Sequence, residues 1–313
     1  MKKALIIRLS SAGDILITAG VIAGLKKSGY ITHLVCKEKF IQAGKAVLPG
    51  RVIAYREGAD FAAALSVENY DVILDLQDNF RSFILRHSVK GRVKKVYKKH
   101  TLRRRLMVLF KWFLRDSKSV SEKYMETAAG MIAPEKTGAL KAPVSLRNKK
   151  IVNIHIHDGA QWKNKRWPYF GLLVKELLKI KKVRITITGV KDEVDNSDGL
   201  LYHKDRRVKN LTGKTDFSGL LKEISLSDLF IGNDTAAAHA AKLYGKPAVI
   251  FLGPTAQAFG FITGKDFTVM ENSALMCRPC HLHGGNSCPI GSLDCMKTTG
   301  VPAVIDRIKK IIF

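Results

Sequence analysis

The sequence has few acidic residues for its size. Its 313 residues contain 27 Asp and Glu against 53 Lys and Arg, which gives a formal net charge of +26 at pH 7. A net charge of only about 2 to 8 is enough to keep a small domain soluble. The excess is concentrated in residues 81–118, where 14 basic side chains face one acidic residue, Asp116. This block favours an acidic partner such as nucleic acid, an anionic lipid surface or a phosphorylated substrate, and a merely solvated basic face is the alternative.

Long apolar runs are missing as well. Residues 106–114 (LMVLFKWFL) form a run of nine interrupted by Lys111, well short of the roughly 18 residues that a membrane span needs. The apolar run 4–7 is broken by Arg8, too early for a signal peptide. We therefore expect a cytoplasmic protein, and peripheral attachment to a membrane stays open.

Repeats and low-complexity tracts are also absent, and the modest content of Gly (25) and Pro (9) excludes a disordered or collagen-like chain. The loop at residues 8–14 (RLSSAGD) carries neither the GxGxxG of a dinucleotide site nor the GxxxxGK[ST] of a P-loop. Ordinary NAD and ATP enzymes are therefore disfavoured.

What the sequence does contain is an alternation of short β-branched runs with amphipathic segments, typical of doubly wound parallel sheets. The length favours two domains, and the polar segment 134–150 divides them into residues 1–147 and 148–313, with an amphipathic helix at 302–313 that could fold back on the first domain. Expected strands are 4–9, 31–36, 70–76, 151–156, 183–188, 229–231 and 248–252. Expected helices are 15–27, 80–87, 103–115, 122–132, 168–179, 217–225 and 235–244.

Ligands of such sheets bind at the carboxyl ends of the strands, so the loops that follow strands are the candidate sites. In the first loop, Gly13 permits a tight turn and Asp14 begins a helix, either as a catalytic carboxylate or only as a helix cap. In the second, at 158–168, Lys165 and Arg166 could reach an anion, or Trp167 could simply anchor a basic loop.

The third loop, at 231–239 (IGNDTAAAH), also joins a strand to a helix. Small residues at 236–238 leave the helix N–H groups open to a phosphate, and the Thr235 hydroxyl and His239 could contact the same ligand. The alternative is a capped helix with a satisfied histidine.

Taken together, these loops resemble the heptosyltransferases of bacterial lipopolysaccharide core assembly, glycosyltransferase family nine. The resemblance covers nearly the whole chain. It is carried by IIRLSSAGDILIT at the start, DLQDNFRS from Asp75, GAQWKNKRWP from Gly159, LTGKTDFSGLLKEISLSDLFIGNDTAAAHAAKLYGKP from Leu211, and CRPCHLHGGNSCPIGSLDCM from Cys277.

The resemblance implies a GT-B architecture, in which two Rossmann-like domains face a central cleft. It also implies inverting, metal-independent transfer of heptose from ADP-L-glycero-β-D-manno-heptose to an acidic glycolipid of the lipid A/Kdo type. The basic block 81–118, with Phe110, Trp112 and Phe113, is then expected to dock the protein on anionic lipid or lipopolysaccharide precursor at the cytoplasmic face of the inner membrane. Asp14 then corresponds to the general base, Lys165 to the diphosphate clamp and Asp234 to a sugar-hydroxyl contact. Further donor contacts fall at Thr235, Ala236, His239, Gly159, Ala160 and Gln161. Acceptor contacts fall at Arg8, Ser10, Ser11, Gln77 and Arg81.

Two positions depart from the family pattern. Ala236 replaces the usual glycine after the Asp-Thr pair and narrows the phosphate approach, while Asp158 replaces the usual proline and would repel a diphosphate unless turned away. A relative that uses another nucleotide-sugar or a protein acceptor is therefore the alternative. A basic nucleic-acid-binding protein is the rival from another class, although no recognition motif of the usual modules is present, so we expect no nucleic-acid partner.

Four of the five cysteines lie close together near the end of the chain. Cys277, Cys280, Cys288 and Cys295 follow the spacing C-x2-C-x7-C-x6-C, and stable disulfides are uncommon in a reducing compartment. Four thiolates can close a shell around zinc or iron, and four protein ligands would make that metal structural. The alternative is a set of packed thiols. No cofactor is expected to be required for catalysis.

Overall fold

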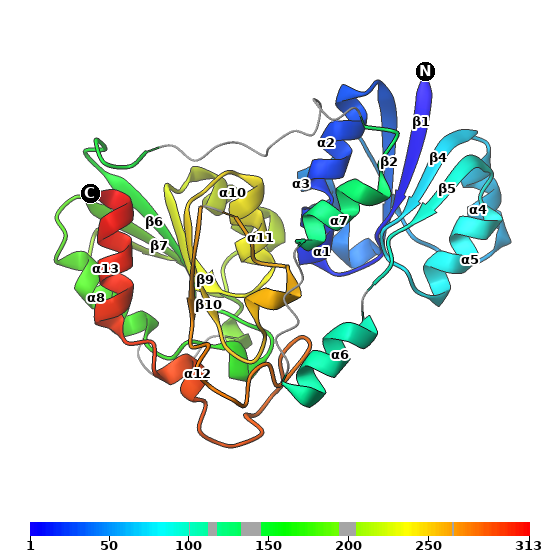
Figure 1. The fold of residues 1–313 in the computed structure, drawn as a ribbon. Coiled ribbons are helices and arrows are strands. Elements are labelled where there is room, and N and C mark those ends of the chain that lie inside the picture. Colours follow the sequence, from blue (N-terminus) through cyan, green and yellow to red (C-terminus); the bar gives the residue numbers. More distant parts are fainter. Residues whose placement is uncertain (100, 112–117, 133–144, 194–204, 265) are drawn as a thin grey trace. The chain divides into compact units, whose positions relative to one another are not determined.

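The structure is a computed structural model that describes residues 1–99, 101–111, 118–132, 145–193, 205–264 and 266–313. The chain forms two compact units, one of residues 1–100 and 118–140 and the other of residues 101–117 and 141–313. Each unit contains one parallel β-sheet with helices on both faces (Figure 1). The expected α/β class with two doubly wound sheets is confirmed.

The first unit is built on a five-stranded sheet with the order β3-β2-β1-β4-β5, in which every pair of neighbours is parallel. Its strands are β1 (Lys2–Ile7), β2 (Tyr30–Cys36), β3 (Arg51–Ala54), β4 (Tyr70–Asp75) and β5 (Gly91–Val96). Its helices are α1 (Ala12–Ile17), α2 (Ala19–Lys27), η1 (Glu38–Phe40), α3 (Ile41–Val47), α4 (Ala59–Ser66), α5 (Phe80–Ser88) and α7 (Val120–Thr127).

The second unit has a six-stranded parallel sheet with the order β11-β10-β9-β6-β7-β8. Its strands are β6 (Val152–His157), β7 (Val183–Thr188), β8 (Val208–Asn210), β9 (Leu229–Asn233), β10 (Ala248–Leu252) and β11 (Phe267–Glu271). Its helices are α6 (Thr101–Phe110), η3 (Lys163–Lys165), α8 (Phe170–Leu178), η4 (Lys191–Glu193), α10 (Phe217–Leu226), α11 (Ala236–Leu243), η6 (Gln257–Phe259), α12 (Asp294–Lys297) and α13 (Val301–Ile312).

Both sheets are sandwiched between two helical layers. In the first unit, α4 and α5 cover one face and α1, α2, α3 and α7 the other (Figure 1). In the second unit, α8 and α13 cover one face, and α10 and α11 the other (Figure 1). The apolar face of α13 carries Val304, Ile308 and Ile312, which are fully buried in the core of the second unit.

A buried tryptophan organises the second core. Trp167 is 1% exposed, stacks on Phe251 at a ring distance of 4.1 Å, and contacts Phe170 edge-on at 5.1 Å. Its indole N–H donates to the carbonyl of Thr299 at 2.9 Å. Burial of an aromatic ring with its polar atom satisfied fixes the neighbouring chain, so the segment just before Trp167, which includes Lys165, has a defined position.

Some element boundaries differ from those expected. The expected helix 15–27 is two helices, because Thr18 ends α1 and its hydroxyl donates to the carbonyl of Ile15 at 2.7 Å. The expected helix 103–115 is α6 as far as Phe110, and residues 112–115 lie outside the described part. The predicted domain boundary at 147/148 stays a prediction, and residues 101–117 group with the second unit.

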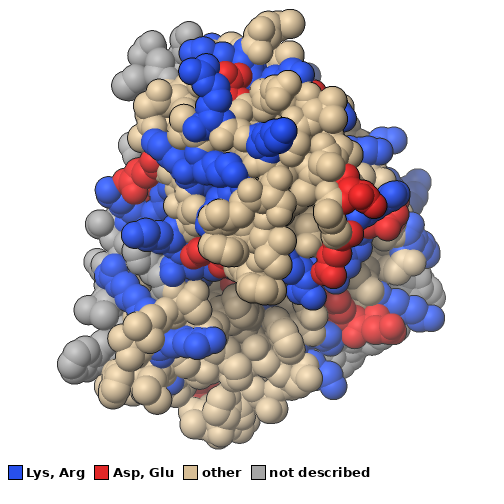
Figure 2. All heavy atoms as spheres, turned by 90° about the vertical axis from the view of Figure 1, so that its right-hand side faces the viewer, with Lys and Arg blue, Asp and Glu red and all other residues tan. Residues whose placement is uncertain are grey.

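The surface reflects the basic composition. Figure 2 shows one side of the molecule, on which Lys and Arg are more widespread than Asp and Glu. Within the described residues, no helix combines the length and the apolarity that a bilayer crossing requires.

Candidate active site

In each sheet, one pair of neighbouring strands is followed by helices that lie on opposite faces of the sheet. In the first sheet, β1 and β4 are neighbours and are followed by the loops 8–11 and 76–79. In the second, β6 and β9 are neighbours and are followed by the loops 158–162 and 234–235. Ligands of doubly wound sheets bind at this switch point. The predicted acceptor and donor residues thus fall on these four loops or on the helices that directly follow them, where the fold favours binding.

Asp14 stands in the first turn of α1, with its two oxygens in different surroundings. Oδ2 accepts hydrogen bonds from the Ser11 backbone N–H at 3.2 Å and the Ser11 hydroxyl at 3.0 Å, and it pairs with Arg8 Nη2 at 2.5 Å. Oδ1 makes no polar contact with the described residues. Asp14 is therefore part of the helix cap, and it also keeps one oxygen for another partner.

The electrostatic setting keeps Asp14 ionised. Burial alone would raise the pKa of its carboxyl, but the charge of Arg8 and the hydrogen bonds from Ser11 outweigh burial and lower the pKa below its ordinary value. Its side chain is 19% exposed. An anionic carboxylate with one fixed and one available oxygen is suited to accept a proton.

Arg8 is the residue that fixes Asp14. It is 4% exposed, its Nη1 donates to the carbonyl of Leu76 at 2.5 Å, and its guanidinium lies 5.9 Å from the centre of the Tyr124 ring. Its buried Nε has no hydrogen-bond partner among the described residues. Sequence analysis assigned Arg8 to acceptor binding, and the structure adds a positioning contact with the candidate base.

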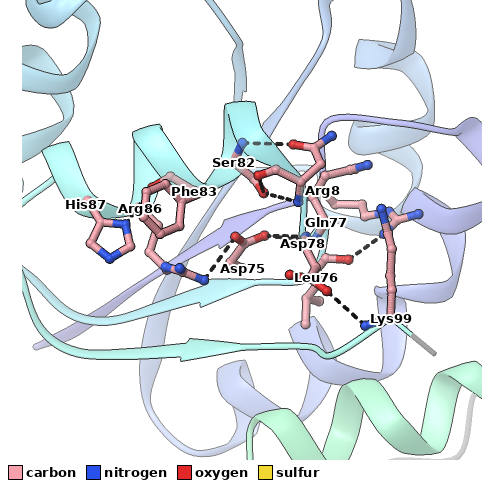
Figure 3. Close-up of polar contacts among 11 residues, drawn as sticks. Arg8, Asp75, Leu76, Gln77, Asp78, Ser82, Phe83, Arg86, His87 and Lys99 are labelled. Atoms are coloured by element: carbon pink, nitrogen blue, oxygen red, sulfur yellow. Dashed lines mark hydrogen bonds and ion pairs between the residues drawn. The ribbon is translucent and has the colours of Figure 1, made fainter. Parts of the chain in front are cut away.

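The loop after β4 is tied to the same place (Figure 3). Gln77 Oε1 accepts from the Ser10 backbone N–H at 3.0 Å. The buried Asp75 carboxylate accepts from the backbone N–H groups of Gln77 at 2.9 Å and Asp78 at 3.0 Å, and it pairs with Arg86 at 3.3 Å. Two candidate acceptor residues, Ser10 and Gln77, are thus in contact. Asp75 and Arg86 were not predicted, because their role is to hold this loop.

Lys99 lies next to Asp78 and Arg8. Sequence analysis did not single it out, although it belongs to the basic block 81–118. Its backbone N–H donates to Asp78 Oδ2 at 3.0 Å, and its side chain runs toward Arg8 (Figure 3). Burial and then the charge of Arg8 lower the pKa of its ammonium group, partly opposed by Asp14, Asp78 and Asp75. No partner for Nζ occurs in the described part of the chain.

Arg81, the fifth predicted acceptor residue, lies on the first turn of α5. It is exposed and pairs with Glu57 at 2.9 Å. The structure therefore brings together five residues, namely Arg8, Ser10, Ser11, Asp14 and Gln77. Arg81 makes its ion pair with the exposed Glu57 instead of with this group.

In the second unit, the residues predicted to hold the donor form a buried ion pair. Lys165 Nζ lies 2.6 Å from Asp234 Oδ2, and the two side chains are 10% and 13% exposed. The Thr255 hydroxyl donates to the same oxygen at 3.0 Å. Burial would raise the pKa of Asp234, but Lys165 reverses this effect, and His239 and Thr255 add to the reversal. Thr255 was missed because nothing in the sequence pairs it with Asp234.

The helix that follows Asp234 begins at an open N-terminus. Thr235 is the N-cap of α11, and its hydroxyl is buried without a hydrogen-bond partner among the described residues. The first N–H groups of a helix have no acceptor within it and attract anions. His239 is buried in the second turn. An orphaned hydroxyl beside these N–H groups and a lysine is a suitable cradle for a phosphate.

The loop after β6 is mainly structural. Asn233 Nδ2 donates to the carbonyl of Asp158 at 3.0 Å, and Arg166 Nε donates to that of Ala160 at 2.9 Å. A Cβ on Gly159 would lie 3.3 Å from the backbone of Gly189, so glycine permits close packing of the loops after β6 and β7. Gln161 is exposed. Arg166, expected to reach an anion, uses its side chain to hold the loop.

Two buried histidines of β6 were also missed by the sequence analysis. His155 Nε2 and His157 Nδ1 lie 2.8 Å and 3.0 Å from the Thr188 hydroxyl. Burial lowers the pKa of His155 to about 3, with a contribution from His157, and lowers that of His157 to about 4. Both rings are neutral, so they belong to the packing of the strand.

The four cysteines predicted as metal ligands are close to one another. Burial raises the pKa of Cys295 to about 11, and burial together with the Cys277 and Cys288 thiols raises that of Cys280. Arg278 fixes this loop by donating to the carbonyls of Leu252, Gly253, Thr255 and Asn272. Among the described residues, no group of three or more His, Cys, Asp or Glu is arranged to hold a metal ion. The thiols as placed do not fit a closed zinc or iron shell.

Elemental analysis tests the metal directly. The structural metal stays a prediction, and about one zinc or iron per chain in protein purified anaerobically without an affinity tag would support it. Metal well below one per chain, with four freely titrating thiols in residues 277–295, would remove it.

Residues 59–284 match glycosyltransferase family 9 (heptosyltransferase). The chain belongs to this family. It is 24% identical over 273 residues to the lipooligosaccharide heptosyltransferase 2 of Campylobacter jejuni subsp. jejuni serotype O:6, an alignment that covers 85% of this chain and 83% of the relative. The protein is therefore a glycosyltransferase, which confirms the predicted family and enzyme class. The rival interpretation as a nucleic-acid-binding protein finds no support in these similarities.

Solved structures of the family are similar in fold. A family 9 glycosyl transferase from Veillonella parvula superposes with a TM-score of 0.74 at 15% identity, covering 99% of this chain and 97% of that one. An E. coli heptosyltransferase solved with ADP gives a TM-score of 0.70 at 20% identity, covering 98% and 99%. These similarities confirm the predicted GT-B-like fold class.

Proposed function

We propose that this glycosyltransferase moves heptose from ADP-L-glycero-β-D-manno-heptose to the acidic inner core of lipopolysaccharide, with inversion at the anomeric carbon. The observation that carries the proposal is the arrangement of Asp14, because it has one oxygen fixed by Arg8 and Ser11 and the other available. The relatives named as heptosyltransferases supply the sugar and the acceptor.

The proposed reaction is a single displacement. The acceptor hydroxyl gives its proton to Asp14 Oδ1 as its oxygen attacks C1 of the heptose from the face opposite the leaving group. The C1 bond to ADP breaks, and the sugar carries oxocarbenium character in the transition state. A carboxylate with a lowered pKa takes the proton late, when the attacking oxygen has become acidic.

Negative charge then collects on the diphosphate that leaves. Lys165, the Thr235 hydroxyl and the first N–H groups of α11 supply positive charge and hydrogen bonds for it. The proposal therefore includes catalysis without a metal ion. Because Lys165 is held by Asp234, its ammonium is oriented before the donor arrives.

The test of the function is direct transfer. Purified protein with ADP-heptose and a Kdo-containing lipid A acceptor is expected to give a product heavier by one heptose, detected by mass spectrometry. Other nucleotide-sugars, and a protein acceptor, should give no product. Transfer from a different nucleotide-sugar in preference to ADP-heptose would replace the proposed donor and leave the glycosyltransferase assignment intact.

Lys165→Ala is expected to weaken ADP binding by about 1.5 to 3 kcal/mol, the range for a hydrogen bond to a charged group. Isothermal titration calorimetry measures this loss. Lys175→Ala, which removes an exposed lysine of α8, is the matched control and should bind ADP normally. Since the variant also leaves Asp234 unpaired, the double variant Lys165→Ala/Asp234→Asn separates the two effects. Unchanged ADP affinity in both variants would move the diphosphate elsewhere.

Lys99→Gln is expected to raise the KM for the acceptor about tenfold or more, because Lys99 lies beside Arg8 and is placed to bind an acceptor carboxylate. The affinity for ADP should not change. Lys98→Gln removes the exposed neighbouring lysine and serves as the control. Steady-state kinetics with varied acceptor decide the matter, and equal KM values for the two variants would rule out this role for Lys99.

A further inference from the structure

Helix α5 exposes an apolar face. Phe80, Phe83 and Ile84 are 77%, 50% and 47% exposed, and their spacing places them on the same side of the helix. Ser82 and Leu85 of the same helix are buried, so α5 uses its other side to pack on the unit. Single exposed apolar residues are ordinary, whereas three adjacent large ones on one helix face mark an interaction surface.

The surroundings of this face are basic. Residues 80–99 contain eight Lys and Arg and no Asp or Glu. The edge strand β5 lies against the end of α5, since Lys94 Nζ donates to the carbonyl of His87 at 3.3 Å. Two acidic side chains from outside this stretch also lie nearby, since Arg92 of β5 is 3.8 Å from Asp71 and Arg81 pairs with Glu57, but basic residues outnumber them and the Arg92 side chain is 84% exposed. Figure 2 views the side on which α5 is drawn in Figure 1, where basic side chains are spread over uncharged surface together with fewer acidic ones.

We propose that α5 and β5 form a docking surface for an anionic lipid bilayer. An interfacial helix inserts apolar side chains at the headgroup boundary while nearby Lys and Arg attract anionic lipids. Charge complementarity favours this occupant over a second copy of the chain, whose equally basic face would repel it. Nucleic acid would satisfy the charges but leave Phe80, Phe83 and Ile84 without a partner.

This surface differs from the one expected from sequence. The basic block was expected to act with Phe110, Trp112 and Phe113. Residues 112 and 113 lie outside the described part, and Phe110 belongs to α6 of the second unit. The apolar component in the first unit is instead on α5.

The position of α5 connects the surface to the candidate base. The helix begins directly after Asn79, and the same loop carries Gln77, which bonds to Ser10. In the proposed function, a glycolipid acceptor anchored in the docked bilayer would thus present its sugars to the loop that holds Asp14. Only this step rests on the proposed function, because lipid binding itself needs neither donor nor acceptor.

The test is co-sedimentation with vesicles that contain two parts of phosphatidylcholine to one part of the anionic lipid phosphatidylglycerol, at low and moderate salt. The native protein is expected to bind these at least tenfold more tightly than vesicles of phosphatidylcholine alone, and binding should weaken with salt. A variant with serine at three exposed positions of α5 should lose at least tenfold. Its substitutions are Phe80→Ser, Phe83→Ser and Ile84→Ser. The matched control removes three exposed apolar residues elsewhere, by Val67→Ser, Leu172→Ser and Leu226→Ser.

A charge-reversal pair completes the design. One variant combines Lys90→Glu, Arg92→Glu and Lys94→Glu. It should abolish vesicle binding, since each basic residue near an anionic surface raises the affinity roughly fivefold. Lys26→Glu, Lys27→Glu and Lys45→Glu change the net charge equally at exposed positions of α2 and α3 and should retain most of the binding. In all four variants, ADP affinity by calorimetry should be unchanged, which shows that the second unit is folded. Their circular-dichroism melting curves should match that of the native protein, which shows that the first unit is folded as well.

Three results would overturn the proposal. The first is equal loss in a test variant and its control, and the second is equal binding to neutral and anionic vesicles. The third is a concentration-dependent dimer, measured by light scattering, that the α5 serine variant abolishes while vesicle binding persists. Failure of heptose transfer with intact vesicle binding would contradict the proposed function alone.

Discussion

Replacing Asp14 by Asn is expected to lower turnover by roughly 10² to 10⁴-fold while leaving the affinity for ADP nearly unchanged. The amide is the same size as the carboxylate, and its oxygen can still accept the hydrogen bonds from Ser11. The variant cannot take a proton from the acceptor. Because Asp14 belongs to the first unit and the residues proposed to bind ADP belong to the second, donor affinity is a separate readout.

The measurement is turnover at saturating donor and acceptor, with ADP binding by calorimetry beside it. Asp216→Asn is the matched control, because Asp216 is also a carboxylate that caps a helix, accepting from the Gly219 N–H at 2.7 Å. The control should keep normal turnover, because it loses only the charge of a helix-capping carboxylate away from the candidate base. If Asp14→Asn resembles the control, Asp14 is only a cap and the proposed mechanism is wrong.

Sequence analysis found the central strands of both sheets and missed the edges. The last four residues of β1 (ALII) and the whole of β10 (AVIFL) are continuous buried apolar runs, which is the pattern of a parallel strand covered on both faces. The four missed strands, β3, β5, β8 and β11, are the edges of the two sheets. Edge strands keep exposed polar side chains, as in the sequence GRVKKV of β5, so their composition resembles that of a loop.

The candidate site divides in the same way. The loops that carry Asp14, Lys165, Asp234 and Thr235 could be located because loops that follow strands are recognisable from hydropathy. The roles given to these four residues came from the family resemblance. Their partners could not be predicted, since the contacts join distant segments. Arg8 reaches Leu76, 68 residues away, and Lys165 pairs with Asp234, 69 residues away. Such pairs depend on strand order, which the sequence pattern leaves undetermined.

The role of Arg8 shows why residue type alone is insufficient. An exposed arginine in this loop would bind an anionic acceptor. The buried Arg8 instead has two of its nitrogens engaged by Asp14 and Leu76, and burial of a charge is tolerated only when it is paired. In the proposed function, it is the half-buried Lys99 of the basic block that binds the acceptor.

The two buried histidines of β6 predict a marked loss of stability in mild acid. The Thr188 hydroxyl has one proton, so at most one of the two ring nitrogens beside it can accept a hydrogen bond from it, and the other can only donate. Protonating both rings would turn both nitrogens into donors and leave the hydroxyl proton without an acceptor. Burial acts in the same direction, and the pKa values of His155 and His157 fall to about 3 and about 4.

The direction of the effect follows from these values. In the unfolded chain the pKa of both histidines is about 6.5. Between about pH 6.5 and pH 4 the unfolded state therefore binds protons that the folded state does not bind. The stabilisation is complete above pH 6.5 and is lost as the pH falls. At pH 5 each histidine accounts for about 2 kcal/mol, so the free energy of unfolding should be about 4 kcal/mol lower than at pH 7. Most carboxylates remain ionised over this interval, and the lowered pKa of His33 adds to the same trend.

Urea denaturation at pH 7, 6 and 5 measures the loss, and the imidazole C–H resonances observed by NMR identify its source. Of the nine histidines in the chain, those assigned to His155 and His157 should keep the chemical shifts of neutral rings at pH 5. The double variant His155→Asn/His157→Asn, if it folds, should depend less steeply on pH. Its absolute stability is a separate matter, because it disturbs a packed strand. Titration of either ring in the folded protein near pH 6.5 would contradict the prediction, since a ring that accepts a proton there has access to water and contributes no such loss.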